Sequence, residues 1–370
     1  MKEIKLSFLS KLALVLFCLI SLTYIAILGQ SLLAPLLFSF LMAILLFPAA
    51  NFLERRLKFK RSLSTIVCVI LMILVIGGII YFFGNQLSSL WADWPLLKEK
   101  ANVSYYELQQ WISRTFGVNS QKQLDYLNDS AEKAIATSAT IVATTLATLS
   151  STLLFLGFTL LFTFFILNYR RVLFTFLISV FKEEHKEKVT EIANQIQYII
   201  KKYIVGLFLQ MFIVTILMIS ILSIMGVKYS ILLGLVAGIF NVVPYLGIFF
   251  ALLISCLITF ATAGAAKVLL VLIVFVGVHA IDGNILMPLV VGSKVKINAL
   301  IAFIGIVVGE MIWGISGMFL CIPYLAILKI IFDRIDPLKP WGILMGEEHK
   351  PEKKKRVYRI TKKIKLEEKD

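Results

Sequence analysis

The chain has 370 residues, of which 59% are hydrophobic and only 16% are charged. Soluble domains are about 45–50% apolar and about 25% charged, so this composition argues against a soluble enzyme or binding module. The apolar residues fall in runs of about 20, which is the length that a helix needs to cross about 30 Å of hydrocarbon. We therefore expect an all-α polytopic membrane protein, because a β-barrel would show shorter alternating segments.

The formal net charge of +15 does not indicate a nucleic-acid partner. Lys and Arg lie at the edges of the apolar runs and in the C-terminal tail, which is typical of the cytoplasmic loops of membrane proteins. The tail is also basic enough to attract anionic membrane lipid. The four cysteines lie inside apolar runs without a Cys-x-x-Cys pair, so no disulfide, metal site or cofactor is expected.

In chain order, we expect about eight spans, at residues 8–28, 31–50, 63–83, 141–168, 203–225, 231–260, 267–290 and 299–332. The first three spans form an N-terminal unit over residues 1–83, and the last five fall within residues 141–333. Residues 84–140 are nearly neutral and are predicted to form amphipathic helices outside the membrane. Loop 169–202 and tail 334–370 are basic, so the positive-inside rule places them and both termini in the cytoplasm, with the protein in the inner (cytoplasmic) membrane.

The sixth predicted span carries small and polar residues on one helical face. Gly234, Gly238, Asn241 and Tyr245 recur at positions i, i+4, i+7 and i+11. Small residues four apart allow another helix to approach closely. Pro244 lacks a backbone N–H, so the helix is expected to kink or break there. Asn241 would then either face a cavity or contribute to helix packing.

The seventh predicted span ends in the segment "VHAIDGNILMP", residues 278–288. His279 and Asp282 are i, i+3 neighbours, which can pair on one helical face. Gly283 and Asn284, followed by Pro288, are expected to let the helix unwind. Unwound backbone at membrane depth is tolerated only where protein buries it or water lines it. The segment is therefore expected to line a transport path, unless it lies at the membrane edge, where its polar residues need no special role.

The eighth predicted span contains Glu310 near its middle, where an ionised side chain costs about 3 kcal/mol or more. Glu310 shares a helical face with Gly314 and Gly317, so it should point toward another helix or a water-filled cavity. Two interpretations fit the Glu310 carboxyl. It is either protonated and hydrogen-bonded within the bundle, or it binds a proton, a cation or the substrate. As one straight helix this span would extend about 51 Å, so the helix is expected to bend, to tilt strongly or to emerge into water near Pro323.

These segments together resemble the AI-2E family, the autoinducer-2 exporter-like permeases. The family's N-x-x-P-Y-x-G element matches residues 241–247, and its D/E-G-N-x-x-x-P element matches residues 282–288. The later glycines and proline of the signature match Gly309, Gly314, Gly317 and Pro323. Two departures are that His279 stands where the family often has an amide residue, and that Asn298 and Ala299 replace its usual His-Pro pair.

The resemblance implies an eight-span inner-membrane protein that forms a homo-oligomer. It also implies either export of a signalling molecule or sodium–proton antiport. No ATP-binding GxxxxGK[ST], HExxH or nucleophile-elbow motif occurs, so neither an ATP motor nor an enzyme is expected.

We therefore expect a secondary transporter that exports a small polar organic solute such as a quorum-sensing signal. In this hypothesis residues 241–245 and 282–288 line the pathway, and Glu310 supplies a coupling or gating charge. One alternative is a cation–proton antiporter that uses Asp282 and Glu310 with Na⁺ or H⁺. A membrane scaffold without transport activity is the alternative from another class.

Overall fold

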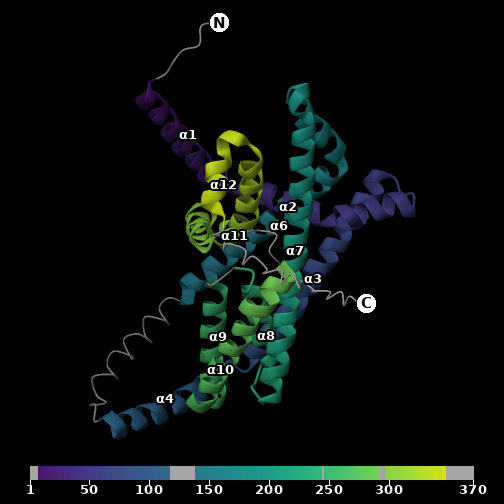
Figure 1. Cartoon of the computed structure of the whole chain (residues 1–370). Helices are drawn as coiled ribbons and strands as arrows, with labels where there is room; N and C mark the ends of the chain where they lie inside the picture. Colours follow the sequence, from purple (N-terminus) through teal and green to yellow (C-terminus); the bar gives the residue numbers. More distant parts are fainter. Residues whose placement is uncertain (1–6, 117–137, 244–245, 292–296, 347–370) are drawn as a thin grey trace, which may run out of the picture.

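The computed structural model describes residues 7–116, 138–243, 246–291 and 297–346, and all of its regular elements are helices (Figure 1). Seven helices of this part are long and apolar enough to cross a membrane, which confirms the all-α polytopic class. These spans lie in α1 (Phe8–Leu28), α2 (Gln30–Arg56), α3 (Arg61–Ala92), α6 (Ser138–Ser179), α7 (Glu183–Ile224), α10 (Ala265–Ile281) and α11 (Ala299–Arg334). The shorter elements are α4 (Trp94–Phe116), α8 (Ser230–Phe240), α9 (Leu246–Ala263), a π-helix (Asp282–Val291), a 3₁₀ turn (Asp336–Leu338) and α12 (Lys339–Met345).

The two segments predicted to lie outside the membrane are largely helical. α3 continues beyond its predicted end at residue 83 to Ala92, and α4 follows directly and packs against α9. Residues 117–137 of the same segment lie outside the described part. Within the predicted connection 169–202, α6 runs to Ser179 and α7 begins at Glu183, so most of this connection is helical. Charged residues here extend the helices out of the apolar region instead of interrupting them.

The sixth predicted span is two helices that form a hairpin, α8 and α9. α8 ends at Phe240, and turn bonds run from Val242 N–H to the Ile239 carbonyl and from Val243 N–H to the Phe240 carbonyl. A side chain at Gly247 would overlap the Phe240 carbonyl, so the chain has turned back on itself there. The break occurs where Pro244 was expected to produce one, although Pro244 and Tyr245 lie outside the described residues.

α11 is also a hairpin, and its turn is not at Pro323. Trp313 and Gly314 have non-helical backbone angles, and Gly314 has φ 59° and ψ −139°, which a residue with a side chain rarely adopts. A Cβ at Gly309 would lie 2.5 Å from the Gly317 carbonyl oxygen, so the two arms touch. The prediction of a break or exit near Pro323 is wrong, because Pro323 is buried within the second helical arm.

The two hairpins reach the middle of α7 from opposite ends. α8 runs along the C-terminal half of α7, with Gly234 beside Ile219 and Gly238 beside Met211. The second arm of α11 packs against an earlier part of α7, where Phe319 and Leu320 share a hydrophobic cluster with residues that include Leu207. The ion pair between Arg334 and Glu191 joins the base of this hairpin to α7 at a point nearer the start of α7. Residues 207–211 of α7 therefore lie where both hairpin tips converge.

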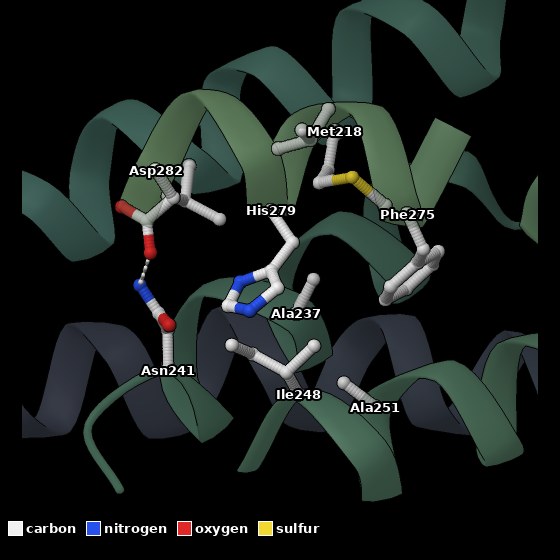
Figure 2. Close-up of a pocket in the computed structure, with 10 residues that line it drawn as sticks. Met218, Ala237, Asn241, Ile248, Ala251, Phe275, His279 and Asp282 are labelled. Carbon is white, nitrogen blue, oxygen red and sulfur yellow. Dashed lines mark hydrogen bonds between the residues drawn. The ribbon is translucent and has the colours of Figure 1, made fainter. Parts of the chain in front are cut away.

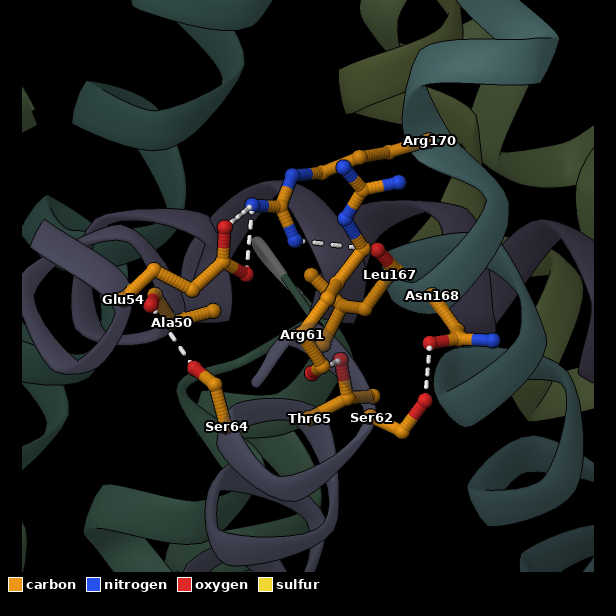
Figure 3. A network of polar contacts seen from close by, with 9 residues as sticks. All are labelled: Ala50, Glu54, Arg61, Ser62, Ser64, Thr65, Leu167, Asn168 and Arg170. Carbon is orange, nitrogen blue, oxygen red and sulfur yellow. Dashed lines mark hydrogen bonds and ion pairs between the residues drawn. The ribbon is translucent and has the colours of Figure 1, made fainter. Parts of the chain in front are cut away.

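A partly buried ion pair fastens α2 to α6 (Figure 3). The Arg170 Nη2 atom lies 2.7 Å from both carboxylate oxygens of Glu54, and Arg170 Nη1 donates to the Leu167 carbonyl. Ser64 of α3 donates to the Ala50 carbonyl of α2 at 2.7 Å. Charge-assisted bonds of this kind are among the stronger polar contacts in proteins, so they fix the packing of these helices.

A second polar contact, outside the spans, joins the end of α3 to the start of α8. Asp93 Oδ2 accepts from Lys228 Nζ at 2.7 Å and from the Tyr229 hydroxyl at 2.5 Å. These hydrogen bonds hold the pKa of the Asp93 carboxyl below its usual 3.8, and the bond to Asp93 raises the pKa of Lys228 above 10.5. Tyr229 has a positive φ of 61°, so this contact also holds an unusual backbone conformation at the start of α8.

Candidate functional site

The carboxyl group of Asp282 is the buried acidic group on which the candidate site is built. Its side chain lies in the apolar part of the bundle, and the residue is only 4% exposed. Gln210 Nε2 lies 2.8 Å from Asp282 Oδ1 and 3.0 Å from Oδ2. Asn241 Nδ2 donates to Oδ2 at 3.1 Å. Two neutral amides from different helices therefore hold one acidic group.

Three elements meet to form this cluster. Gln210 lies on α7 at the level where the hairpin tips converge, and Asn241 caps the C-terminal end of α8. Asp282 lies at the junction of α10 and the π-helix. The cluster therefore joins a continuous helix, a hairpin tip and a loosened helix, so a shift in any one of them changes the hydrogen bonds at Asp282.

The two glycines of α8 determine how closely Asn241 approaches α7. A side chain at Gly234 would overlap that of Ile219, and one at Gly238 would overlap the Thr215 hydroxyl. The helix backbones therefore lie closer together than larger residues would permit, as expected for small residues four apart. Asn241 follows Gly238 by less than one helical turn, so this close packing brings its amide to Asp282.

The segment after Asp282 is a π-helix and has not unwound as predicted. Its wider turns are a common feature at functional sites. The Asn284 amide is exposed and donates to the Ala280 carbonyl at 2.8 Å instead of pointing at Asp282. Gly283 is exposed and has open space where a side chain would lie. Pro288 lies within the π-helix.

A cavity of about 20 Å³ adjoins Asp282, which is room for about one water molecule. Figure 2 shows the His279 imidazole pointing into this space, between Asn241 and Phe275. The predicted pairing of His279 with Asp282 is not formed, because the Asp282 oxygens accept from Gln210 and Asn241 instead. The remaining lining is apolar, from Val214, Met218, Ala237, Ile248, Ala251, Phe275 and Val278.

The chemistry of this cavity is that of a carboxyl group with no positively charged partner among the described residues. Neither Lys nor Arg is among the residues that line it. A buried charge is costly unless it is paired, so a proton or a small cation at Asp282 would remove most of that cost. Carboxylate oxygens are hard ligands that suit such a cation. Within the described residues, no group of three His, Cys, Asp or Glu side chains could hold a metal ion.

Glu310 does not belong to this cluster. It lies on the first arm of α11, close to the turn at Gly314, and its side chain is exposed on the surface of the chain. Of the residues assigned to the pathway, the structure brings Asn241 to Asp282 and places Glu310 apart from them. Sequence reasoning also missed Gln210, although a single amide within the apolar run "GLFLQMFIV" is a signal of the same kind as Asn241.

Comparison with known protein families matches residues 16–336 to the family described as "AI-2E family transporter". Among relatives, "Putative transport protein YrrI" of Bacillus subtilis is 34% identical over 106 residues, which are 29% of this chain and 30% of that protein. "AI-2 transport protein TqsA" of Escherichia coli is 24% identical over 131 residues, which are 35% of this chain and 38% of that protein. Each of these alignments thus spans roughly a third of the relative's length.

Proposed function

Because the chain belongs to the AI-2E family of membrane transporters, we propose that it exports a small polar organic solute by secondary transport coupled to Asp282. In this proposal Asp282 binds H⁺ or Na⁺. The charge of its carboxyl group sets the strength of the hydrogen bonds from Gln210 and Asn241, which connect it to α7 and α8. The name of the TqsA relative supports autoinducer-2 as the first solute to test.

The observation that carries the proposal is the buried Asp282 carboxyl, held only by neutral amides beside a cavity that admits one water. When Asp282 is ionised, both amides donate to it, and bonds to a charged acceptor contribute about 1.5–3 kcal/mol each. Neutralising the carboxyl weakens these bonds. Binding of H⁺ or Na⁺ is thereby linked to the packing of the α8–α9 hairpin, which is the requirement for coupled transport.

The small cavity favours a second candidate, cation–proton antiport. A volume of about 20 Å³ accommodates a water molecule or a bare monovalent cation but no organic solute. An antiporter would need only Asp282 to exchange H⁺ for Na⁺. An exporter must in addition open a larger path between the two hairpins.

Glu310 has a separate role in the proposal. An exposed acidic side chain in an apolar helix is costly in lipid, so it needs a polar neighbour. A second copy of the chain or a water-filled part of the path would supply one. We therefore place Glu310 at a gate or at an interface of a homo-oligomer in the cell membrane, with both chain termini on the cytoplasmic side.

Flux across the membrane of proteoliposomes tests these roles. Wild type is compared with Asp282→Asn, Gln210→Leu and Glu310→Gln under an imposed proton or sodium gradient, with autoinducer-2 inside or absent. Asp336→Asn is the matched control, because Asp336 is exposed at the base of the α11 hairpin. Asp282→Asn should lower gradient-driven flux at least about tenfold, which corresponds to about 1.4 kcal/mol in the coupled equilibrium.

The outcomes separate the three functions. Gradient-driven movement of autoinducer-2 supports the exporter, and proton movement that depends on Na⁺ without the solute supports the antiporter. Equal flux in wild type and in Asp282→Asn would refute the role of Asp282. Absence of any flux from well-folded wild-type protein would support the scaffold instead.

A further inference from the structure

Two hydroxyl groups on α9 are buried and have no hydrogen-bond partner among the described residues. Ser255 and Thr259 are both 0% exposed, and neither Oγ of Ser255 nor Oγ1 of Thr259 makes a hydrogen bond within the described part of the chain. A buried polar group without a partner is rare and costly, so each case needs an explanation. The two residues are four apart and so lie on one helical face.

The other buried serines and threonines in the described part of the chain behave differently. Each of them donates to a backbone carbonyl, as Ser and Thr usually do inside apolar helices: Ser39, Ser64, Thr65, Thr159 and Thr163. On α9 itself, Thr262 donates to the carbonyls of Ile258 and Thr259. The helical position therefore does not explain why Ser255 and Thr259 lack a partner.

The row of hydroxyls starts at the Asp282 cavity. Ala251 lines that cavity and is also 0% exposed, and Ser255 and Thr259 follow it at four-residue intervals. At 1.5 Å per residue, Thr259 lies about 12 Å along the helix from Ala251. α9 ends one further turn away at Ala263, which is exposed. Figure 2 shows Ala251 on the α9 side of the cavity.

We infer that this face of α9 is an access path, in which water and a small monovalent cation pass between the Asp282 cavity and the end of α9 near Ala263. A hydroxyl can donate to one water and accept from another, and its oxygen can ligate Na⁺. Ser255 and Thr259 are thus paired while the path is hydrated. The inference rests on the proposed ion-binding role of Asp282 and specifies by which route the ion reaches it.

Cysteine labelling tests the path without relying on transport. In a chain whose four native cysteines are replaced, Ser255→Cys and Thr259→Cys are exposed to 2-aminoethyl methanethiosulfonate, a small cationic thiol reagent. Thr163→Cys is the matched control, because Thr163 is equally buried but donates to the Thr159 carbonyl. We expect labelling at positions 255 and 259 at least about tenfold faster than at 163; equal protection of all three would overturn the inference.

A second experiment removes the hydroxyl groups of Ser255 and Thr259. Ser255→Ala and Thr259→Val delete a group without a protein partner, so the unfolding temperature should stay the same or rise. Flux should nevertheless fall at least about tenfold, the scale of one lost bond to an ion. Thr163→Val should leave flux unchanged. If both α9 variants keep their flux while Asp282→Asn is inactive, the access path is refuted and the role of Asp282 is not. If positions 255 and 259 are labelled but the wild-type protein transports nothing, only the proposed function is refuted.

Discussion

Gly238 should be the position on α8 where one methyl group most directly disturbs the candidate site. A Cβ there would overlap the Thr215 hydroxyl and lie 2.9 Å from the Met211 carbonyl oxygen. Ordinary contact begins at 3.4 Å, so α8 must move away from α7 by about 0.5 Å. A shift of this size along the bond from Asn241 to Asp282 would lengthen it from 3.1 Å to about 3.6 Å, which is beyond hydrogen-bonding distance.

Gly238→Ala therefore has two costs. Forcing a methyl group into well-packed surroundings costs about 1–3 kcal/mol. Loss of the bond from Asn241 to Asp282 removes up to about 3 kcal/mol more if Asp282 is ionised. We expect a lower unfolding temperature in detergent and reduced gradient-driven flux in proteoliposomes.

Two further variants make this prediction specific. Gly157→Ala on α6 is the control, because no atom lies within 4 Å of its added methyl group, and it should not lower the unfolding temperature. Thr215→Ala combined with Gly238→Ala removes the overlapping hydroxyl. The double variant should regain at least about 0.5 kcal/mol of the free energy of unfolding, measured as the coupling energy of a double-mutant cycle. If Gly238→Ala unfolds at the same temperature as Gly157→Ala, the inference that Gly238 allows α8 to pack closely against α7 is refuted.

Three further predictions concern other parts of the fold. Gly314→Ala should destabilise the protein by about 1–3 kcal/mol in thermal unfolding, although the site has open space, because the backbone there disfavours a side chain. Arg170→Lys should cost about 1–2 kcal/mol, since a lysine keeps the charge but cannot reproduce the guanidinium geometry at Glu54; an unchanged unfolding temperature would contradict this. The contact of Asp93 with Lys228 should stabilise the protein above pH 3.8 and below pH 10.5, because the pKa of Asp93 is lowered from the first value and that of Lys228 is raised from the second. The stability that Asp93 contributes is then lost as the pH falls through its lowered pKa. Coincident unfolding curves for wild type and Asp93→Asn at both pH 6 and pH 3 would contradict this prediction.

Part of the candidate site could be predicted from the sequence because it depends on local chemistry. The missing N–H of Pro244 predicts a break in the sixth span, and the structure has α8 end four residues earlier, at Phe240. The four-residue spacing of Gly234 and Gly238 predicts a close helix contact, which α8 makes with α7. Asn241 shares the helical face of these glycines beside the break, which makes it a candidate either for a cavity or for helix packing.

Other features could not be predicted because they depend on which helices meet. Gln210 is 72 residues from Asp282 in sequence, and neither the spacing nor the residue type indicates that the two make contact. Glu310 shares a helical face with small residues, yet the hairpin turn at Gly314 leaves it on the surface. His279 and Asp282 have the spacing of a pair, but in the fold the oxygens of Asp282 accept from two amides on other helices instead.

The sequence by itself thus determined the membrane class, the approximate extent of most spans and the residues that interrupt them. These properties follow from the length of apolar runs and from backbone chemistry, which act within a few turns of one helix. The tertiary structure alone decided that α8–α9 and α11 turn back as opposing hairpins, and that Gln210, Asn241 and Asp282 meet. Such contacts arise from packing between distant helices, where each backbone position allows several neighbours and only the complete fold selects one.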